Sequence, residues 1–432
     1  MKKTLAVLLA TLMVLACFSG CGDTAAPSES GSTAPSESGS EPASEATGDK
    51  AFPDTTLTFW HYYSGSTGED VTTLFNQYAE QPDRSNIKLD VVFVPFGDLK
   101  KQLSVGTAAG TLPDLVLIDN CDNVAYSAMG IFADITDVMA SEENLKDYYE
   151  QIIATTMYEG KQYSVPFMSN NQGIWYNKDM FEAAGITKIP ESYEEIRDAA
   201  KKLTKDGVYG FGMSAVQNEE GTSQFLPFQI ASSGDAYDPY KLDSEGGLRA
   251  LKFLTSMVED GSMPKDVVAW SQSDVGTQFS NQKIAMMMMG CWYITEYRTN
   301  WPDLNWGVFP IKDKTFGTIY GGENLAAIDG EDKEVAIDFL KWYIQYDVSK
   351  PWNLANDHFP PRDATLTDPD YQTDDWKVFI DLIPYTIARP ADVKYPEVST
   401  GHQLALQEAL TLAKSPEEAV KDGQAVIDAA LA

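Results

Sequence analysis

The first part of the chain beyond residue 52 alternates two patterns of apolar and polar positions. Short runs rich in β-branched and aromatic residues are typical of strands, and they alternate with segments whose apolar residues recur every three or four positions, as on one face of a helix. The patterns predict strands over 56–62, 87–94 and 113–118 and helices over 70–79 and 98–109. This β-α-β-α-β order indicates an α/β fold with a mostly parallel sheet.

Sheets of this kind bind ligands beyond the carboxyl ends of their strands. The first predicted strand ends in Trp60, His61 and Tyr62, and Asp119 and Asn120 follow the third. We therefore expect these five residues to lie near a ligand site.

The remainder of the chain mixes both patterns. A strand-like run ends at Pro166, and a second strand is predicted over 173–177. Ser192 followed by Glu195, and Ser415 followed by Glu418, have the spacing of capping boxes, which begin helices. Further helices are predicted over 246–259, 333–345, 374–382, 402–414 and 416–430, strands over 283–289 and 304–310, and a strand, a Gly-rich turn and a second strand over 315–328.

The N-terminal segment has the pattern of an export signal. Two lysines precede an apolar run over 4–16, which is too short to span a bilayer comfortably. Cys21 follows Ser19 and Gly20, and this arrangement resembles the lipobox of bacterial lipoproteins. We predict a lipoprotein signal peptide over 1–20, with Cys21 as the acylated residue and Cys17 as the competing site.

The segment 21–51 that follows is rich in Ser, Glu and Pro and has few apolar residues. Such a composition cannot offset the entropy of ordering, so we predict a disordered tether between the acylated cysteine and the folded body. No later run of about 18 apolar residues is present, so the lipid is the predicted attachment to the membrane.

Charge narrows the classes of partner. The 432 residues include 32 Lys and Arg against 64 Asp and Glu, a net charge of −32. A surface of that sign disfavours nucleic acid and anionic lipid headgroups, whereas it tolerates neutral or cationic ligands. Cys121 and Cys291 are expected to be free and buried. The three histidines are not spaced as a metal pair, so neither a metal nor a cofactor is predicted.

A set of collinear segments resembles a known family. The segments are 163–166 (YSVP), 173–181 (GIWYNKDMF), 109–115 (AGTLPDL), 279–286 (FSNQKIAM) followed by 290–292 (GCW), and 321–328 (GGENLAAI). Their order and spacing are similar to those of extracellular solute-binding proteins of ATP-binding-cassette importers, and the sugar-binding branch that includes maltose-binding protein fits best. No single segment is decisive, but together they cover nearly the whole body.

The resemblance implies a periplasmic-binding-protein-like fold. Two α/β lobes would be joined by crossing strands, with a ligand cleft and a hinge between them. The first lobe would comprise 52–165 and 319–346, and the second 166–318 and 347–432. Ligand that contacts both lobes would shift an open population toward a closed one.

A sugar site needs flat aromatic faces for C–H patches and planar polar groups for hydroxyls. Aromatic residues make up 11% of the chain, including nine Trp. Trp292 is the first choice, because matching Gly-x-Trp turns in the family often stack on sugar rings. The candidate ligand-binding residues are Trp60, His61, Tyr62, Asp119, Asn120, Asn170, Asn171, Trp270, Trp292, Tyr320, Glu323 and Asn324.

The resulting hypothesis is a monomeric, non-enzymatic, lipid-anchored receptor on the cell surface or in the periplasm. It would capture a carbohydrate, an oligosaccharide by preference, and deliver it to a membrane permease. A binding protein for a cationic solute such as a polyamine is the alternative. An extracellular glycoside-active enzyme is the third reading, although Gly-x-Ser-x-Gly and His-Glu-x-x-His motifs are missing from the chain.

Overall fold

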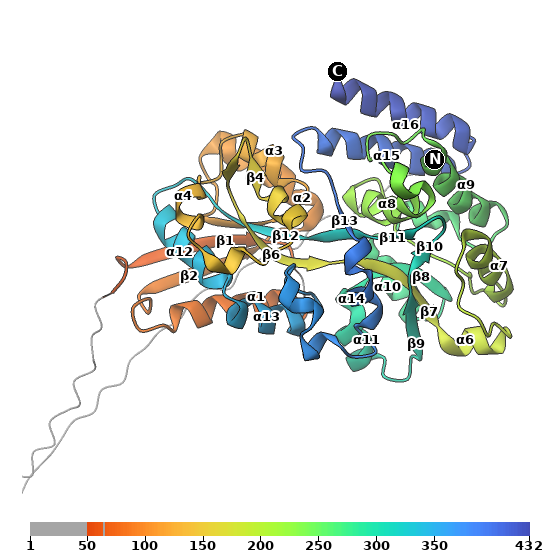
Figure 1. Ribbon diagram of the computed structural model, residues 1–432, viewed down its shortest axis with the longest axis horizontal. Helices are drawn as coiled ribbons and strands as arrows, with labels where there is room; N and C mark the ends of the chain where they lie inside the picture. The colour runs from red at the N-terminus through yellow and green to blue at the C-terminus, as the bar shows by residue number, and fades with distance from the viewer. Residues whose placement is uncertain (1–49, 64) are drawn as a thin grey trace, which may run out of the picture. The chain divides into compact units, whose positions relative to one another are not determined.

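The computed structural model describes residues 50–63 and 65–432 (Figure 1). The predicted signal peptide, Cys21 and nearly all of the predicted tether lie outside these residues. The strands are β1 (Thr55–His61), β2 (Ile87–Phe93), β3 (Leu115–Asp119), β4 (Met157–Tyr158), β5 (Lys161–Gln162), β6 (Val165–Asn170), β7 (Gln172–Asn177), β8 (Met286–Gly290), β9 (Trp306–Phe309), β10 (Ile311–Lys312), β11 (Phe316–Gly317), β12 (Ile319–Ala327) and β13 (Ile387–Ala388).

The α-helices of the described residues include every helix predicted from the sequence. They are α1 (Gly65–Ala79), α2 (Phe96–Ala109), α3 (Asn123–Ala128), α4 (Thr136–Met139), α5 (Glu150–Thr155), α6 (Lys178–Ala183), α7 (Tyr193–Leu203), α8 (Glu219–Ser233), α9 (Glu245–Glu259), α10 (Gln272–Ser280), α11 (Ile294–Asn300), α12 (Lys333–Tyr343), α13 (Tyr346–Ala355), α14 (Lys377–Leu382), α15 (Tyr395–Leu410) and α16 (Pro416–Leu431). None of them combines the length and the apolar character that a membrane span requires.

The first sheet has the strand order β13-β12-β3-β1-β2, and β6 also pairs with β12. β1 runs parallel to β2 and to β3, as the alternating pattern predicts, whereas β12 is antiparallel to β3. The core on this sheet includes a stacked pair, Phe75 of α1 and Phe339 of α12, with ring centroids 4.1 Å apart. The helices that were predicted between the strands therefore cover this sheet.

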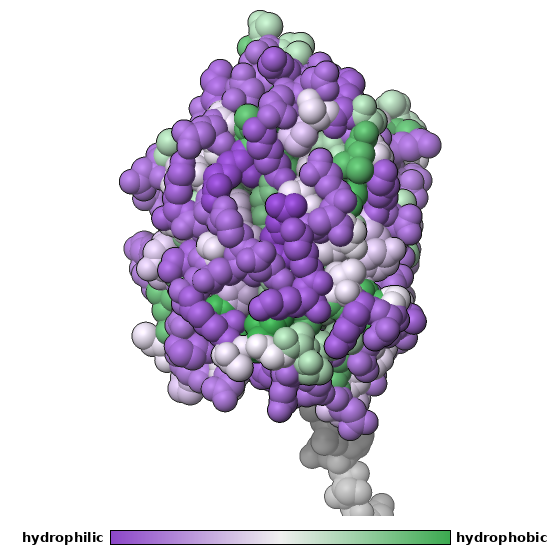
Figure 2. Space-filling view, turned by 90° about the vertical axis from the view of Figure 1, so that its right-hand side faces the viewer, coloured by the Kyte–Doolittle hydropathy of each residue, from purple (hydrophilic) through white to green (hydrophobic). Residues whose placement is uncertain are grey.

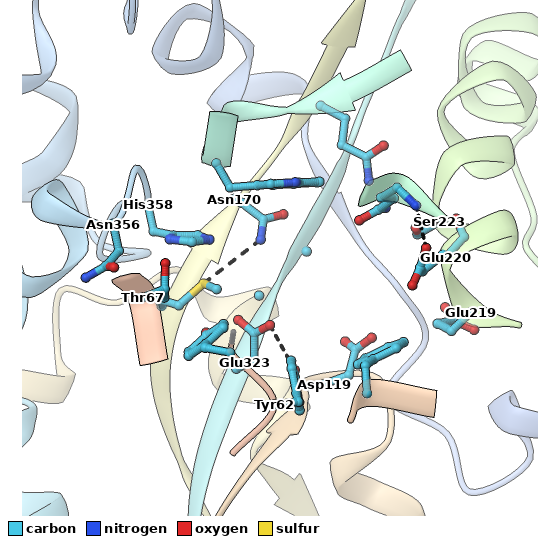
Figure 3. Close-up of a pocket in the computed structure, with 18 of the residues that line it drawn as sticks. Tyr62, Thr67, Asp119, Asn170, Glu219, Glu220, Ser223, Glu323, Asn356 and His358 are labelled. Atoms are coloured by element: carbon cyan, nitrogen blue, oxygen red, sulfur yellow. Dashed lines mark hydrogen bonds between the residues drawn. The ribbon is translucent and has the colours of Figure 1, made fainter. Parts of the chain in front are cut away.

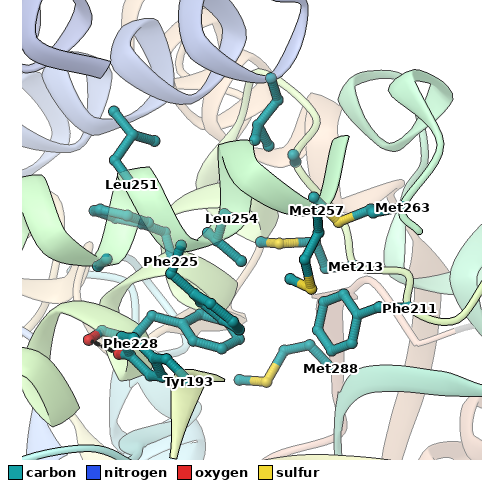
Figure 4. Close-up of a cluster of buried hydrophobic side chains, with 14 of the residues drawn as sticks. Tyr193, Phe211, Met213, Phe225, Phe228, Leu251, Leu254, Met257, Met263 and Met288 are labelled. Carbon is teal, nitrogen blue, oxygen red and sulfur yellow. Dashed lines mark hydrogen bonds between the residues drawn. The ribbon is translucent and has the colours of Figure 1, made fainter. Parts of the chain in front are cut away.

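The second sheet has the order β8-β7-β9 and is antiparallel. Both faces of β8 are buried, because Met286 and Met288 enter one core and Met287 and Met289 enter another. Figure 4 shows the first of these cores, where Met288 lies among aromatic and aliphatic side chains from α7, α8 and α9. The run of four methionines is thus a buried strand, as the sequence predicts.

Several segments of chain connect the two sheets and the helices that pack on them, and both sheets belong to one compact unit of the chain. The first connection passes from β6 to β7, the second from β11 to β12, and a third leaves β13 toward α15. The chain also crosses between α13 and α14, because α14 packs against β7. Thr318 ties the first two together, because its hydroxyl donates to the carbonyl of Gln172 (3.0 Å) and accepts from the amide of Gln172 (3.1 Å). We refer to the halves around the first and second sheets as the first and second lobes.

The connections differ in two places from the expected lobe limits. β6 pairs with β12 in the first sheet, so the chain leaves the first lobe near Asn171 rather than at 165. α13 also packs on the first lobe, because its Trp352 enters the core of the first sheet. The expected start of the second lobe at 347 therefore falls inside a helix of the first.

The sequence predicts a Gly-rich turn between two strands over 315–328, and this turn is wrong. β12 runs without interruption through Gly321 and Gly322 and shifts its register with β6 between Glu323 and Asn324. Gly322 has φ of +116°, and a Cβ there would lie 2.3 Å from the carbonyl oxygen of Met168. The glycines permit close approach of two strands instead of a reversal of the chain.

Candidate functional site

A cavity of about 410 Å³ lies where the first sheet, the second sheet and α8 meet (Figure 3). Its volume is in the range of small-molecule sites. The lining residues come from both lobes and from the segments that connect them. They are Tyr62, Tyr63, Thr67, Phe96, Asp119, Met168, Asn170, Gln172, Glu219, Glu220, Ser223, Gln272, Ser273, Trp292, Tyr293, Glu296, Gly321, Gly322, Glu323, Asn356, His358 and Arg389.

Five of the twelve residues predicted from the sequence line this cavity: Tyr62, Asp119, Asn170, Trp292 and Glu323. Each stands at or just beyond the end of a strand, except Glu323, which lies inside β12 at the irregularity of its register. The position of a residue relative to a strand end was therefore a useful signal.

The other seven predicted residues do not line the cavity. Trp60 and His61 are the last two residues of β1, and the chain borders the cavity only from Tyr62 onward. Asn324 follows Glu323 and donates to the hydroxyl of Thr155 (3.1 Å), because neighbouring strand residues point to opposite faces.

The remaining four have partners elsewhere. The side-chain amide of Asn171 donates to the backbone carbonyl of Phe379 (2.8 Å). The hydroxyl of Tyr320 donates to the backbone carbonyl of Ile383 (3.3 Å). Trp270 packs against the core of the second lobe. Asn120 accepts from Arg389 (3.1 Å), so it contacts a lining residue without lining the cavity itself.

Several lining residues were not predicted. Glu219, Glu220 and Ser223 lie on α8, a helix without an amphipathic pattern because nearly all of its residues are buried. The local signal was Asn218, which caps this helix by accepting from the amide of Glu220 (2.8 Å) before two acidic residues. Arg389 has no local signal, because its partners are far away in the sequence.

The position of the Trp292 side chain depends on the absence of a Cβ at Gly290. Trp292 lies in a 3-10 turn, Cys291–Tyr293, directly after β8, and its side chain is partly buried. A Cβ on Gly290 would lie 1.8 Å from the indole ring. Only glycine at 290 leaves room for the ring to lie across the end of the strand.

We expect Gly290→Ala to weaken ligand binding by about 1 kcal/mol, because the indole would be pushed from its position while the backbone keeps an ordinary conformation. Isothermal titration calorimetry on the variant measures the change. An unchanged dissociation constant would show that the ring position does not matter for binding.

Glu323 is a buried acid between two tyrosines. The hydroxyl of Tyr62 donates to its Oε1 (2.8 Å), whereas its Oε2 is buried without a partner. Burial, together with the charge of Asp119, raises the pKa of Glu323 to about 8. The side chain is therefore mainly a neutral acid at pH 7.

Arg389 joins carboxylates of both lobes. Its Nη1 donates to Asp119 at the end of β3 (2.9 Å) and to Glu219 at the start of α8 (2.9 Å), and Nη2 donates again to Asp119. Burial by itself would lower the pKa of Arg389, but these carboxylates outweigh it and raise the pKa well above its usual value. Arg389 is 4% exposed.

The cavity is acidic. Besides the neutral acid Glu323, its lining includes the carboxyl groups of Asp119, Glu219, Glu220 and Glu296 but a single guanidinium, that of Arg389, which already has two carboxylate partners. His358 adds no charge, because burial lowers its pKa to about 3. Within residues 50–63 and 65–432, no group of three or more His, Cys, Asp or Glu side chains is arranged to hold a metal ion.

The family model for bacterial extracellular solute-binding proteins matches residues 64–348. The chain belongs to this family. Its members are binding proteins of importers, not enzymes. Two lobes around a cavity are thus the architecture of a solute-binding protein, and the expectation from the collinear segments is confirmed.

Curated relatives cover most of this solute-binding protein. A putative binding protein of Brucella abortus (strain 2308) is 28% identical over 387 residues, which are 85% of this chain and 91% of the relative. The sn-glycerol-3-phosphate-binding periplasmic protein of Escherichia coli (strain K12) is 26% identical over 326 residues, which are 70% of this chain and 72% of the relative.

The fold is shared with solved structures. An ABC transporter solute-binding protein from Thermotoga lettingae, bound with α-D-tagatose, superposes with a TM-score of 0.78. It is 24% identical, and the match covers 88% of this chain and all of that one. This similarity shows the two-lobed fold of the solute-binding protein.

Proposed function

We propose that the protein is an extracytoplasmic receptor that captures a neutral carbohydrate, an oligosaccharide by preference, and delivers it to an ABC permease. The acylated Cys21 would anchor it to the membrane, and the receptor would act as a monomer. The face in Figure 2 carries mainly hydrophilic side chains with scattered hydrophobic ones, so this face offers no broad apolar surface for a partner.

The observation that carries this proposal is the combination of an aromatic face with planar polar groups in one cavity. Trp292 and Tyr293 supply aromatic surface, and Asn170 and Gln172 supply amides. Sugar rings offer C–H patches to the former and hydroxyls to the latter. The tagatose bound to the Thermotoga lettingae protein supports the same ligand class.

The charges of the cavity argue against an anionic ligand such as sn-glycerol 3-phosphate. A phosphate group needs cations or free N–H donors. Here Arg389 is occupied by Asp119 and Glu219. The E. coli relative therefore shares sequence with this chain, whereas the glycerol phosphate in that relative's name does not suit this acidic cavity.

A cationic solute such as a polyamine is the second candidate. Glu220 and Glu296 line the cavity, and neither forms an ion pair with any residue in the described part of the chain. Two carboxylates of this kind could pair with ammonium groups. Affinity that falls steeply with salt would favour the cation, whereas salt-insensitive binding would favour a neutral sugar.

A thermal-shift screen of the purified protein tests the proposal. Mono- and oligosaccharides would be compared with polyamines, amino acids and sn-glycerol 3-phosphate. We expect one sugar class to raise the melting temperature, because a ligand at 100 times its dissociation constant adds about 2.7 kcal/mol to the free energy of unfolding. A shift with polyamines alone, or with glycerol phosphate, would overturn the sugar assignment.

A further inference from the structure

The ion pairs of Arg389 join parts of the chain that lie in different lobes. Asp119 ends β3 of the first sheet, and the next amide, that of Asn120, donates to Gly322 of β12 (3.1 Å). Glu219 begins α8, which packs with α9 and α15 in the second lobe. Arg389 itself follows β13 on the third connection. The guanidinium of Arg389, on a segment that connects the lobes, therefore forms ion pairs with one carboxylate of each lobe.

The three side chains are nearly removed from water. The side-chain exposure is 3% for Arg389, 4% for Glu219 and 10% for Asp119. In such surroundings ion pairs are screened weakly by solvent and salt, so their contribution depends on the positions of the partners. A rotation of one lobe against the other must lengthen the bond of Arg389 to one of the two carboxylates.

The two carboxylates differ in the hydrogen-bond donors that each would keep if its ion pair with Arg389 broke. Glu219 also accepts from the hydroxyl of Tyr395 (2.9 Å) and from that of Ser399, both on α15 of the same lobe. Asp119 has no side-chain donor besides Arg389 in the described part of the chain. The bond to Glu219 is thus the easier one to give up, and Arg389 stays with Asp119.

We propose that Arg389, Asp119 and Glu219 form an interlobe clamp that sets how far the empty receptor opens. The clamp closes when Arg389 bonds Glu219 and opens when that bond breaks, while Tyr395 and Ser399 keep Glu219 satisfied on its own lobe. Arg389 acts as a positioning residue for the two lobes. The proposal needs two lobes that move, but it does not depend on the class of the ligand.

Small-angle X-ray scattering of the ligand-free protein tests the clamp. We expect Glu219→Gln to increase the radius of gyration, because the loss of the charge weakens the bond that crosses between the lobes. Glu220→Gln is the matched control. Glu220 is the next residue of α8 and lines the same cavity, but it accepts from the amide of Gln272 (2.7 Å) and not from Arg389.

An equal radius of gyration for Glu219→Gln and wild type would overturn the proposal, as would an equal increase in both variants. Circular dichroism reports whether each variant is folded. Should Glu219→Gln not fold, Arg389→Lys gives the same test, because a single ammonium keeps the charge but cannot present the guanidinium fork to two carboxylates. These readouts contain no ligand, so failure of the sugar assignment leaves them intact.

Discussion

Trp292→Ala is expected to weaken sugar binding by about 1–3 kcal/mol, which corresponds to roughly 5- to 150-fold in the dissociation constant. The indole packs on the core of the second lobe on one side and lines the cavity on the other, so the loss in affinity reports its contact with the ligand and any loss in stability reports its contact with the core. Calorimetric titration of the ligand found in the thermal-shift screen measures the difference between variant and wild type.

Trp270→Ala is the control for this prediction. Trp270 is also partly buried and also packs on the core of the second lobe, but it does not line the cavity. We expect this variant to melt at a lower temperature and to bind with the wild-type affinity. If Trp292→Ala behaves in the same way, Trp292 is a core residue and the aromatic platform must be sought at Tyr62 or Tyr293.

Glu323→Gln should be more favourable to stability at pH 8 than at pH 4.5, by about 4 kcal/mol in the free energy of unfolding. The pKa of Glu323 is about 8 in the folded protein, against an ordinary value of 4.5. Between these two pH values the unfolded chain releases a proton that the folded chain retains. The free energy of unfolding of the wild type therefore falls as the pH rises through this window. The variant does not show this fall, because glutamine does not titrate.

Chemical denaturation at pH 4.5 and pH 8 measures the effect. Burial also raises the pKa of Asp357 to about 7 and that of Asp122 to about 6, but both groups are present in wild type and variant, so they cancel in the comparison. Glu259→Gln, a change at an exposed position at the end of α9, should have the same small effect at both pH values. The prediction fails if Glu323→Gln has equal effects at the two pH values.

Local patterns predicted most of the elements. The capping box of Ser415 and Glu418 begins α16 as expected, with both hydrogen bonds present. At Ser192 only half of the box forms, because Glu195 accepts from Glu191 instead (2.7 Å). The helix begins at the predicted place nevertheless. Such signals succeed because the residues that make them are neighbours in the sequence.

Two features besides Arg389 could not be predicted from local patterns. α8 is buried on almost every side, so it has no polar face to reveal its period, and it supplies three lining residues of the cavity. The turn expected at Gly321 and Gly322 is absent, because those glycines are required by the contact of β12 with β6. Both depend on which segments meet in three dimensions. Arg389 is a third case of this kind.

Three of the connections between the sheets border the cavity. Asn170 and Gln172 flank the first, Gly321 to Glu323 follow the second, and Arg389 lies on the third. A solute in this cavity would therefore touch the connecting segments as well as the two lobes. The measured dissociation constant then depends on two quantities: the intrinsic dissociation constant of the binding conformation, and the fraction of empty molecules that already adopt this conformation. Substitutions near the connections can consequently change the solute concentration at which the importer responds, while every side chain that contacts the solute stays the same.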